Sequence, residues 1–171
     1  MLIDISGILL SDGESRYYDI ELGPDDVGLE DGKQLLSGIS ISLHIYNEDG
    51  YLHVKGYTEV ALTAPCDRCL TETKVTFPVN IDEEYEIRGN LITLDDDAAP
   101  YFTGESLDAE KLLHDSVLSS MPSKVLCKED CKGLCPVCGQ NLNERDCGCD
   151  RTVGDPRMEK FKELFEKFKE V

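Results

Sequence analysis

The chain of 171 residues lacks tryptophan, long hydrophobic runs and an excess of basic residues. No apolar run approaches the roughly 20 residues that a membrane-spanning helix needs, so we expect a soluble protein that does not enter a membrane. The first residues, MLIDISGILLSDGES, have neither the positively charged region nor the apolar region of a secretory signal peptide. These absences predict a cytoplasmic protein whose cysteines stay reduced.

Basic residues are few relative to acidic ones: 17 Lys and Arg stand against 35 Asp and Glu, a net charge of -18. Residues 1–106 contain 22 acidic and 6 basic residues, whereas residues 107–171 contain 13 and 11. Binding to nucleic acid depends largely on Lys and Arg displacing counterions from phosphates. Free nucleic acid is therefore an unfavourable partner and a basic protein a favourable one, although acidity that only confers solubility is an alternative explanation.

Signatures of catalysis are also missing from the sequence. It contains no glycine-rich loop of the Walker or dinucleotide-binding type. The three histidines, His44, His53 and His114, have no evident Ser, Cys or Asp partner in sequence, so each is interpreted as a surface or packed residue. The sequence therefore predicts a protein that is not an enzyme and has no catalytic residues.

Residues 1 to about 94 have the pattern of β-strands. Within residues 39–46 apolar and polar residues alternate, which places one face of a strand in a core and the other toward water. Turn-forming residues follow at 47–50, and YLHVKGYTEVALTA resumes the extended pattern, so a β-hairpin is predicted. Another strand is predicted over 73–87. Residues 22–38 lack clear periodicity and are predicted to form a loop with at most a short helix.

A helix is predicted to begin with Ser106 as its N-cap and to end at Pro122. Its apolar residues recur at steps of three and four and are expected to face the sheet: Leu112, Leu113, Val117, Leu118 and Met121. A second, amphipathic helix is predicted from Asp155 and Pro156 onward.

These elements predict an α+β fold, built from an antiparallel β-sheet or partly open barrel with packed helices. We expect an acidic, β-rich domain over residues 1–121 that ends in a helix. A Cys-rich, zinc-stapled module with a C-terminal amphipathic helix is expected over residues 122–171, packed on the first domain.

Eight cysteines are the most informative feature, and six of them lie in the segment 127–149. Cys135-Pro-Val-Cys138-Gly is a C-x2-C-G knuckle that aims two thiolates at one point, and Cys147-Gly-Cys149 returns a second pair. These four predict one tetrahedral metal site. The remaining pairs predict a second site formed by Cys66, Cys69, Cys127 and Cys131. Spacing alone leaves the partition open, since Cys131 and Cys135 are near enough to exchange roles.

Zinc is the expected cation, with one or two Zn²⁺ per chain, because closed sites of four thiolates are typical of structural zinc. Disulfides are disfavoured because they belong to secreted chains. Residues 131–138 also match the iron–sulfur pattern of radical enzymes that use S-adenosylmethionine, but too little chain follows to form their barrel. A zinc deaminase site is disfavoured because the two halves of its signature would occur in reverse order.

The segment between Pro122 and Pro156 is poor in apolar side chains. Burying each of them is worth about 1.5 to 3 kcal/mol at best, against about 1 to 2 kcal/mol lost per ordered residue. Metal binding contributes on the order of 10 to 16 kcal/mol in zinc-finger peptides. The cysteines are therefore predicted to be structural ligands.

Several of these motifs occur together and in a familiar order. CDRCL, a helix that closes in a proline, CKEDCKGLCPVCGQNLN, and CGC with DPR before a terminal helix resemble the YceD family of bacterial large-ribosomal-subunit RNA accumulation proteins. The resemblance extends from about Val54 and is most specific at residues 66–70, 131–143 and 155–157. It implies a role in ribosome biogenesis through rRNA accumulation, without a known catalytic activity, and it favours zinc as scaffold. Together with the charge, it predicts a basic ribosomal protein or a large-subunit assembly intermediate as partner.

Two other functions are kept as alternatives. A zinc-ribbon RNA-binding module would use a local basic face, formed by Lys124, Lys128, Lys132, Arg145, Arg151 and Arg157. The same residues equally balance the charge of thiolates and nearby acids. A thiol-based redox-sensing protein would release zinc when its cysteines are oxidised.

Overall fold

The computed structural model describes residues 1–29, 32–89, 91–92 and 101–151. The chain forms two compact units. Unit 1 consists of Met1–Pro65 and Glu72–Val125, and unit 2 of Cys66–Thr71 and Leu126–Val171. Unit 2 thus begins a few residues after the expected boundary and also takes in a short loop from the first half of the chain. Neither described helix has the length and apolar character of a membrane span.

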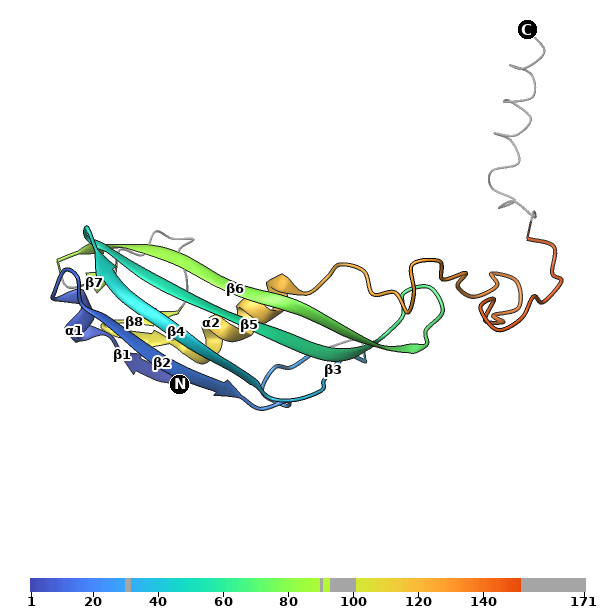
Figure 1. Ribbon diagram of the computed structural model, residues 1–171, viewed down its shortest axis with the longest axis horizontal. Helices are drawn as coiled ribbons and strands as arrows, with labels where there is room; N and C mark the ends of the chain where they lie inside the picture. Colours follow the sequence, from blue (N-terminus) through green and yellow to red (C-terminus); the bar gives the residue numbers. More distant parts are fainter. Residues whose placement is uncertain (30–31, 90, 93–100, 152–171) are drawn as a thin grey trace, which may run out of the picture. The chain divides into compact units, whose positions relative to one another are not determined.

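The main sheet of unit 1 is antiparallel and curls into a half-barrel (Figure 1). Its strands, in spatial order, are β2 (Ser15–Leu22), β4 (Ile39–Glu48), β5 (Tyr51–Pro65), β6 (Glu72–Arg88) and β7 (Leu91–Ile92), and β3 (Gln34–Leu35) also pairs with β5. The expected α+β class with an antiparallel sheet or partly open barrel is confirmed. Among the described residues of the segment 22–38, where a loop with at most a short helix was expected, Leu22 ends β2 and Gln34–Leu35 form the short strand β3.

The predicted hairpin between β4 and β5 is confirmed. Glu48 lies opposite Tyr51, and Asp49 and Gly50 between them have φ values of 53° and 80°. Two consecutive positive φ values characterise the tight turns that match the right-handed twist of paired strands. The preceding residue, Asn47, is buried, and its Nδ2 donates to the carbonyl oxygen of Ile8 at 3.0 Å.

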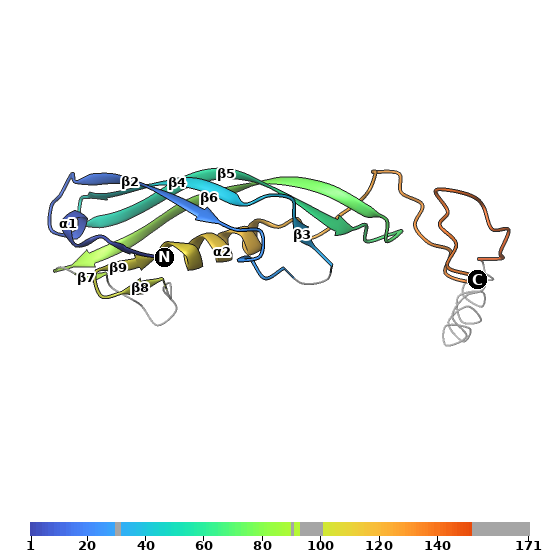
Figure 2. The ribbon, with the colours of Figure 1, turned by 90° about the horizontal axis from the view of Figure 1, so that it is seen from below.

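The core lies on one face of the main sheet. The alternating residues of β4 that were expected to face inward are buried: Ile39, Ile41, Leu43 and Ile45. Figure 2 shows that this face is covered by α1, α2 and a small second sheet. These elements are α1 (Ser6–Leu9), α2 (Ala109–Ser120), β1 (Leu2–Asp4), β9 (Ser106–Asp108) and β8 (Phe102–Thr103), the last three pairing in the order β1-β9-β8. The one-turn helix α1 was not predicted.

Helix α2 begins later than predicted. Ser106 is not the N-cap but belongs to β9, where it pairs with Asp4 of β1. The N-cap is Asp108, whose Oδ1 accepts a hydrogen bond from the backbone N–H of Lys111 at 3.3 Å. A pairing with a strand about a hundred residues away thus takes precedence over the local capping preference of serine.

The predicted apolar face of α2 is mostly correct. Leu112, Leu113 and Val117 are buried, and Met121 packs against the core just after the helix. The prediction that Leu118 faces the sheet is wrong, because 38% of this residue is exposed. Five residues after Leu113, it lies on another side of a helix with 3.6 residues per turn. The helix ends before Pro122, as predicted, whereas the predicted helix from Asp155 onward lies outside the described residues.

Candidate metal centres

The loop that joins β5 to β6 is a cysteine knuckle. Leu70 donates its backbone N–H to the carbonyl of Cys66 at 2.9 Å, and Cys66 donates its own to the carbonyl of Thr71 at 2.9 Å. Leu70 has a φ of 61°, a conformation that costs a non-glycine residue about 1 to 2 kcal/mol. This turn brings Cys66 and Cys69 onto the same side of the loop, as a C-x2-C metal knuckle requires.

A second knuckle is built in the same way from the segment after Cys131. Gly139 donates to the carbonyl of Cys135 at 2.8 Å, and Cys135 donates to the carbonyl of Gln140 at 2.8 Å. Gly139 has a φ of 73° and occupies the position that Leu70 holds in the first knuckle. The two C-x2-C motifs therefore share one backbone geometry.

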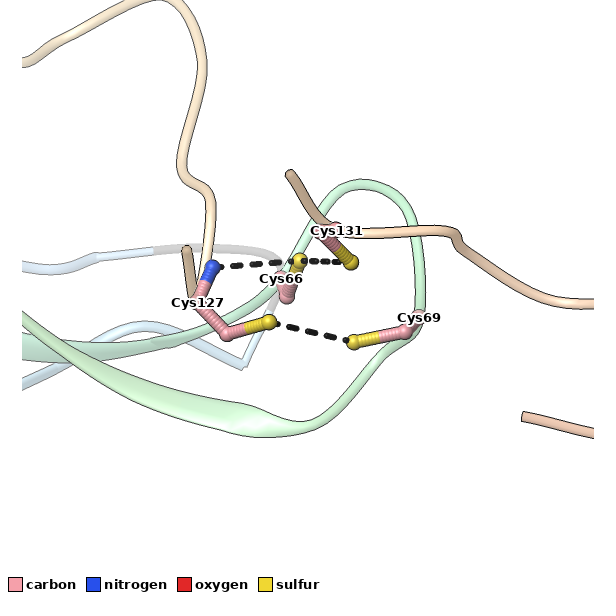
Figure 3. Close-up of side chains that lie close together, drawn as sticks. All are labelled: Cys66, Cys69, Cys127 and Cys131. Carbon is pink, nitrogen blue, oxygen red and sulfur yellow. Dashed lines mark hydrogen bonds between the residues drawn. The ribbon is translucent and has the colours of Figure 1, made fainter. Parts of the chain in front are cut away.

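The first group of thiols, the Cys66 quartet, consists of Cys66, Cys69, Cys127 and Cys131. Figure 3 shows their sulfur atoms directed toward one another, from the knuckle loop and from the segment after Val125. The Sγ atoms of Cys66 and Cys131 are 3.8 Å apart, and those of Cys69 and Cys127 are 3.6 Å apart. Tetrahedral zinc with sulfur at about 2.3 Å requires sulfur–sulfur separations of about 3.8 Å. The spacing of these thiols suits such an ion.

The second group, the Cys135 quartet, consists of Cys135, Cys138, Cys147 and Cys149, all four Sγ atoms lying within 4.8 Å of one another. Cys135 is buried, Cys147 and Cys149 are partly buried and Cys138 is exposed. The Cys147-Gly-Cys149 turn is fixed by Asp146, whose Oδ1 accepts from the N–H of Gly148 at 3.1 Å. This carboxylate also pairs with Arg151 at 2.6 Å.

The electrostatics of both quartets favour partial ionisation in the absence of an ion. Burial opposes ionisation of Cys66, but backbone N–H groups directed at its sulfur lower the pKa of this thiol to about 6. Backbone N–H groups of Cys138 and Val137 likewise lower the pKa of Cys135 to about 6. Burial and the neighbouring sulfurs raise the pKa of Cys127 to about 12, and the neighbouring sulfurs raise that of Cys149 to about 12. Four thiolates at this spacing need a cation to neutralise them.

Two side chains that the sequence did not single out support the Cys66 quartet. Asn143 donates from Nδ2 to the sulfur of Cys131 at 3.3 Å, while its Oδ1 accepts from the N–H of Lys132 at 2.9 Å. Arg68 donates to the carbonyl of Cys131 at 2.8 Å. Both residues lie within the quoted motifs CDRCL and CKEDCKGLCPVCGQNLN, but the motifs do not show these roles, because each residue acts through backbone or sulfur atoms brought close only by the fold.

The backbone of Arg68 also holds the first knuckle close to the segment that leads into the second knuckle. Its carbonyl accepts from the N–H of Leu134 at 3.0 Å. Gly133, with a φ of 75°, passes so close that a Cβ atom would lie 3.0 Å from the same carbonyl oxygen. A glycine is needed here both for its conformation and for its lack of a side chain.

The structure brings together the eight predicted cysteines in the two groups that were expected from spacing. The exchange of roles between Cys131 and Cys135 does not occur. The predicted basic face is partly engaged with acids or amides: Lys128 lies 3.9 Å from Asp130, and Arg145 donates to Gln140 at 2.9 Å. Arg157 lies outside the described residues.

The donor chemistry of both quartets fits zinc. Four thiolate sulfurs in tetrahedral arrangement are typical of structural zinc, and hard cations such as Mg²⁺ and Ca²⁺ prefer oxygen ligands. With four protein ligands, no coordination position is left for a substrate. Two groups of thiols able to bind metal are therefore the main functional feature of the described part of unit 2.

Comparisons with known proteins agree with the motifs. A Mycobacterium leprae (strain TN) protein called uncharacterized is 26% identical over 61% of this chain and 49% of its own length. A Mycobacterium bovis protein, also called uncharacterized, is 26% identical over 96% of this chain and 81% of its own length. The chloroplastic "Large ribosomal RNA subunit accumulation protein YCED homolog 1" of Arabidopsis thaliana is 27% identical over 68% of this chain.

The chain spans about half the length of the M. leprae and Arabidopsis relatives, at 49% and 45%. No solved structure matches it significantly. Residues 54–165 match the family described as "Large ribosomal RNA subunit accumulation protein YceD". This region includes all eight cysteines and exceeds half of the sequence, and the chain therefore belongs to the YceD family.

Proposed function

We propose that this protein supports the accumulation of large-subunit ribosomal RNA as a non-enzymatic assembly protein, and that zinc bound by both quartets holds its second unit in shape. Membership of the YceD family supports the role in rRNA accumulation. The observation that carries the metal assignment is the convergence of eight thiols into two groups of four, each within 4.8 Å.

A structural role for zinc follows from how little apolar surface unit 2 buries. Among its described residues, only the four cysteines Cys66, Cys69, Cys131 and Cys135 and the small Gly133 are buried. Leu126 and Leu134 are only partly buried, and Val137 is 62% exposed. Such a unit gains little from hydrophobic burial, whereas a bound ion contributes on the order of 10 kcal/mol.

The proposal of a non-enzymatic role rests on the closed donor sets. A catalytic zinc keeps one position open for water or substrate, whereas each quartet supplies four protein ligands. None of the three histidines belongs to either quartet: His44 and His53 stack with tyrosines on the sheet, and His114 contacts Asp115 at 2.9 Å on α2. We place the protein in the cytoplasm, where reduced thiols remain available to metal.

For the partner, we propose a basic ribosomal protein or assembly intermediate in preference to free RNA. A net charge of -18 opposes approach to phosphates over most of the surface. Arg151 lies against Asp146 in the segment that an RNA-binding module would use, which reduces the basic surface available there. The RNA-binding and redox-sensing alternatives have no comparable support from the described contacts.

Depleting the protein from its own cells tests the proposed function. We expect the ratio of large- to small-subunit rRNA to fall and to recover when the intact chain is supplied. Because zinc is proposed to shape unit 2, the Cys131→Ser variant should fail to restore the ratio. RNA electrophoresis with subunit profiles measures this outcome, and an unchanged ratio after depletion would contradict the proposed role.

Asn143→Asp tests the support of the Cys66 quartet. The aspartate keeps an oxygen for the N–H of Lys132 but loses the N–H that Asn143 donates to the sulfur of Cys131. Loss of an outer-shell partner typically costs 10-fold to 100-fold in metal affinity, so the zinc affinity of one site should fall by about that factor. Competition with a chromophoric chelator measures both sites. Equal affinities in variant and parent would refute this role for Asn143.

A further inference from the structure

A ladder of stacked rings crosses three strands of the main sheet in unit 1. Tyr17 of β2 stacks on His44 of β4 with ring centroids 4.4 Å apart and planes within 9° of parallel. His44 stacks on Tyr46 at 4.8 Å, and Tyr46 on His53 of β5 at 4.6 Å. We call these four residues the ring ladder. Its rings come from positions that alternate with core residues, so the ladder lies on the face of the sheet opposite the core.

This outer face is open to solvent within unit 1. The described helices and the small second sheet of the unit lie on the core side, as Figure 2 shows. Tyr17, at one end of the ladder, is 70% exposed, and the nearby Tyr57 and Tyr51 are 60% and 40% exposed. A shallow depression of about 340 Å³ adjoins the ladder and is lined by residues that include His44, Lys55 and Tyr57. The face thus presents aromatic surface beside a hollow.

Carboxylates surround the ring ladder. The strand register places Glu84 beside His53, Asp82 beside Lys55 and Glu86 beside Tyr51 on this same face. Asp19 and Glu48 add two more acidic residues at neighbouring outward positions of β2 and β4. Against these five carboxylates, the described residues nearby offer two basic side chains: Lys55 is paired with Asp82 at 3.3 Å and Arg88 with Glu86 at 3.0 Å. The outer face is therefore aromatic and negatively charged.

We propose that this face is the docking surface for an arginine-bearing segment of a basic protein. A guanidinium group is planar, stacks on aromatic rings and pairs with carboxylates in a fixed fork geometry, so it satisfies both features of the face at once. Tyrosine and arginine are also the residues that contribute most to protein–protein interfaces. This surface supplies a binding site for the basic partner proposed above. The assignment of the arginine-bearing segment to the assembling large subunit rests on that proposed function.

Charge decides between a protein and an RNA as occupant. Exposed aromatic rings on a sheet also stack with nucleic-acid bases, but such platforms combine the rings with basic residues that hold the phosphates. Here the side chains beside the rings are mainly Asp and Glu, with His53 only 3.5 Å from Glu84. Phosphates would be repelled by these carboxylates, whereas guanidinium groups are attracted.

Binding of the full, zinc-loaded chain to a synthetic peptide of alternating arginine and glycine tests the proposal. Fluorescence anisotropy at physiological salt should detect binding, with weaker binding of the matched lysine peptide because an ammonium group does not stack in the same way. Replacing Tyr17 and Tyr46 with serine should weaken arginine-peptide binding about fivefold or more, the effect of losing a cation–π contact. The Glu84→Gln, Glu86→Gln variant should weaken binding by a similar factor.

Two control variants separate a defined surface from general attraction of opposite charges. Leu10→Ser changes an exposed apolar residue elsewhere in unit 1, and the double variant Glu105→Gln, Glu110→Gln removes two exposed charges next to β9 and in α2, on the core side of the sheet. Both should bind the arginine peptide as the parent does. Equal weakening by the charge control, or no weakening by the ring-ladder variant, would overturn the proposal, as would tighter binding of single-stranded oligouridine than of the peptide.

The peptide experiment and the rRNA experiment fail independently. If the peptide binds as expected but depletion leaves the rRNA ratio unchanged, the docking surface stands and the proposed function does not. If depletion lowers the ratio but the variants of the outer face bind the peptide like the parent, the proposed function stands and the docking surface does not. Spectra that report the folded state of each variant keep a folding defect from being read as a binding defect.

Discussion

Cys131→Ser is expected to halve the zinc content, from two ions per chain to one, and to unfold the part of unit 2 around the Cys66 quartet. The Sγ atom of Cys131 lies 3.8 Å from that of Cys66, and its backbone carbonyl accepts from Arg68. Removing one of four thiolates leaves a site too weak to retain the ion when the protein is purified in the presence of a chelator. The folding free energy that the ion supplies, on the order of 10 kcal/mol, is then lost as well. Elemental analysis measures the zinc, and backbone NMR spectra report which residues lose order.

Unit 1 should remain folded in this variant, because its core is formed by other residues. Val137→Ser is the matched control: it places a serine between Cys135 and Cys138, at a side chain that is already 62% exposed. This control should keep both ions and the parent spectrum. A Cys131→Ser protein that retained two zinc ions and an unchanged spectrum of unit 2 would contradict the structural role of the metal.

Leu113→Ala is expected to destabilise unit 1 by about 2 to 5 kcal/mol, the usual cost of a cavity in a packed core. The Leu113 side chain is completely buried, and α2 packs against β6 and β2 on the core side of the sheet. For a unit of this size, such a loss lowers the melting temperature by roughly 10 °C or more. Thermal unfolding followed by circular dichroism measures the shift.

Leu118→Ala provides the matched control in the same helix. Leu118 is 38% exposed, so truncating it should cost well under the loss at Leu113 and change the melting temperature by only a few degrees. Similar losses at both positions would mean that the packing of α2 differs from the one described.

The strands were predictable because their signals are local and repeated. The alternation of Ile39, Ile41, Leu43 and Ile45 and the turn around Asp49 and Gly50 fix both the strand and its reversal. The start of α2 was not predictable, because Ser106 has the composition of an N-cap but pairs with β1, a strand far away in sequence. The prediction that Leu118 is buried was wrong for a different reason: steps of three and four also include residues at the margin of a helical face.

The candidate metal centres were largely predictable, because a thiolate quartet needs few residue types at short spacings. Cys135 and Cys138 lie in one turn, and so do Cys66 and Cys69. The supporting contact of Arg68 was not predictable, because it joins two segments 63 residues apart. That of Asn143 was not predictable either, because it depends on how the chain folds back onto Cys131 over the 12 residues between them. The ring ladder was missed as well, since its members come from three strands whose register the sequence does not give.

The Cys66 quartet draws its two halves from parts of the chain that a ribosome makes at different times. Cys69 and Cys127 are 58 residues apart, so at about 5 to 20 residues per second the knuckle waits roughly 3 to 12 s for its other half. During that interval β6 and α2 are synthesised. Capture of this ion therefore follows the synthesis of nearly all of unit 1 and marks a late step in the maturation of each new molecule.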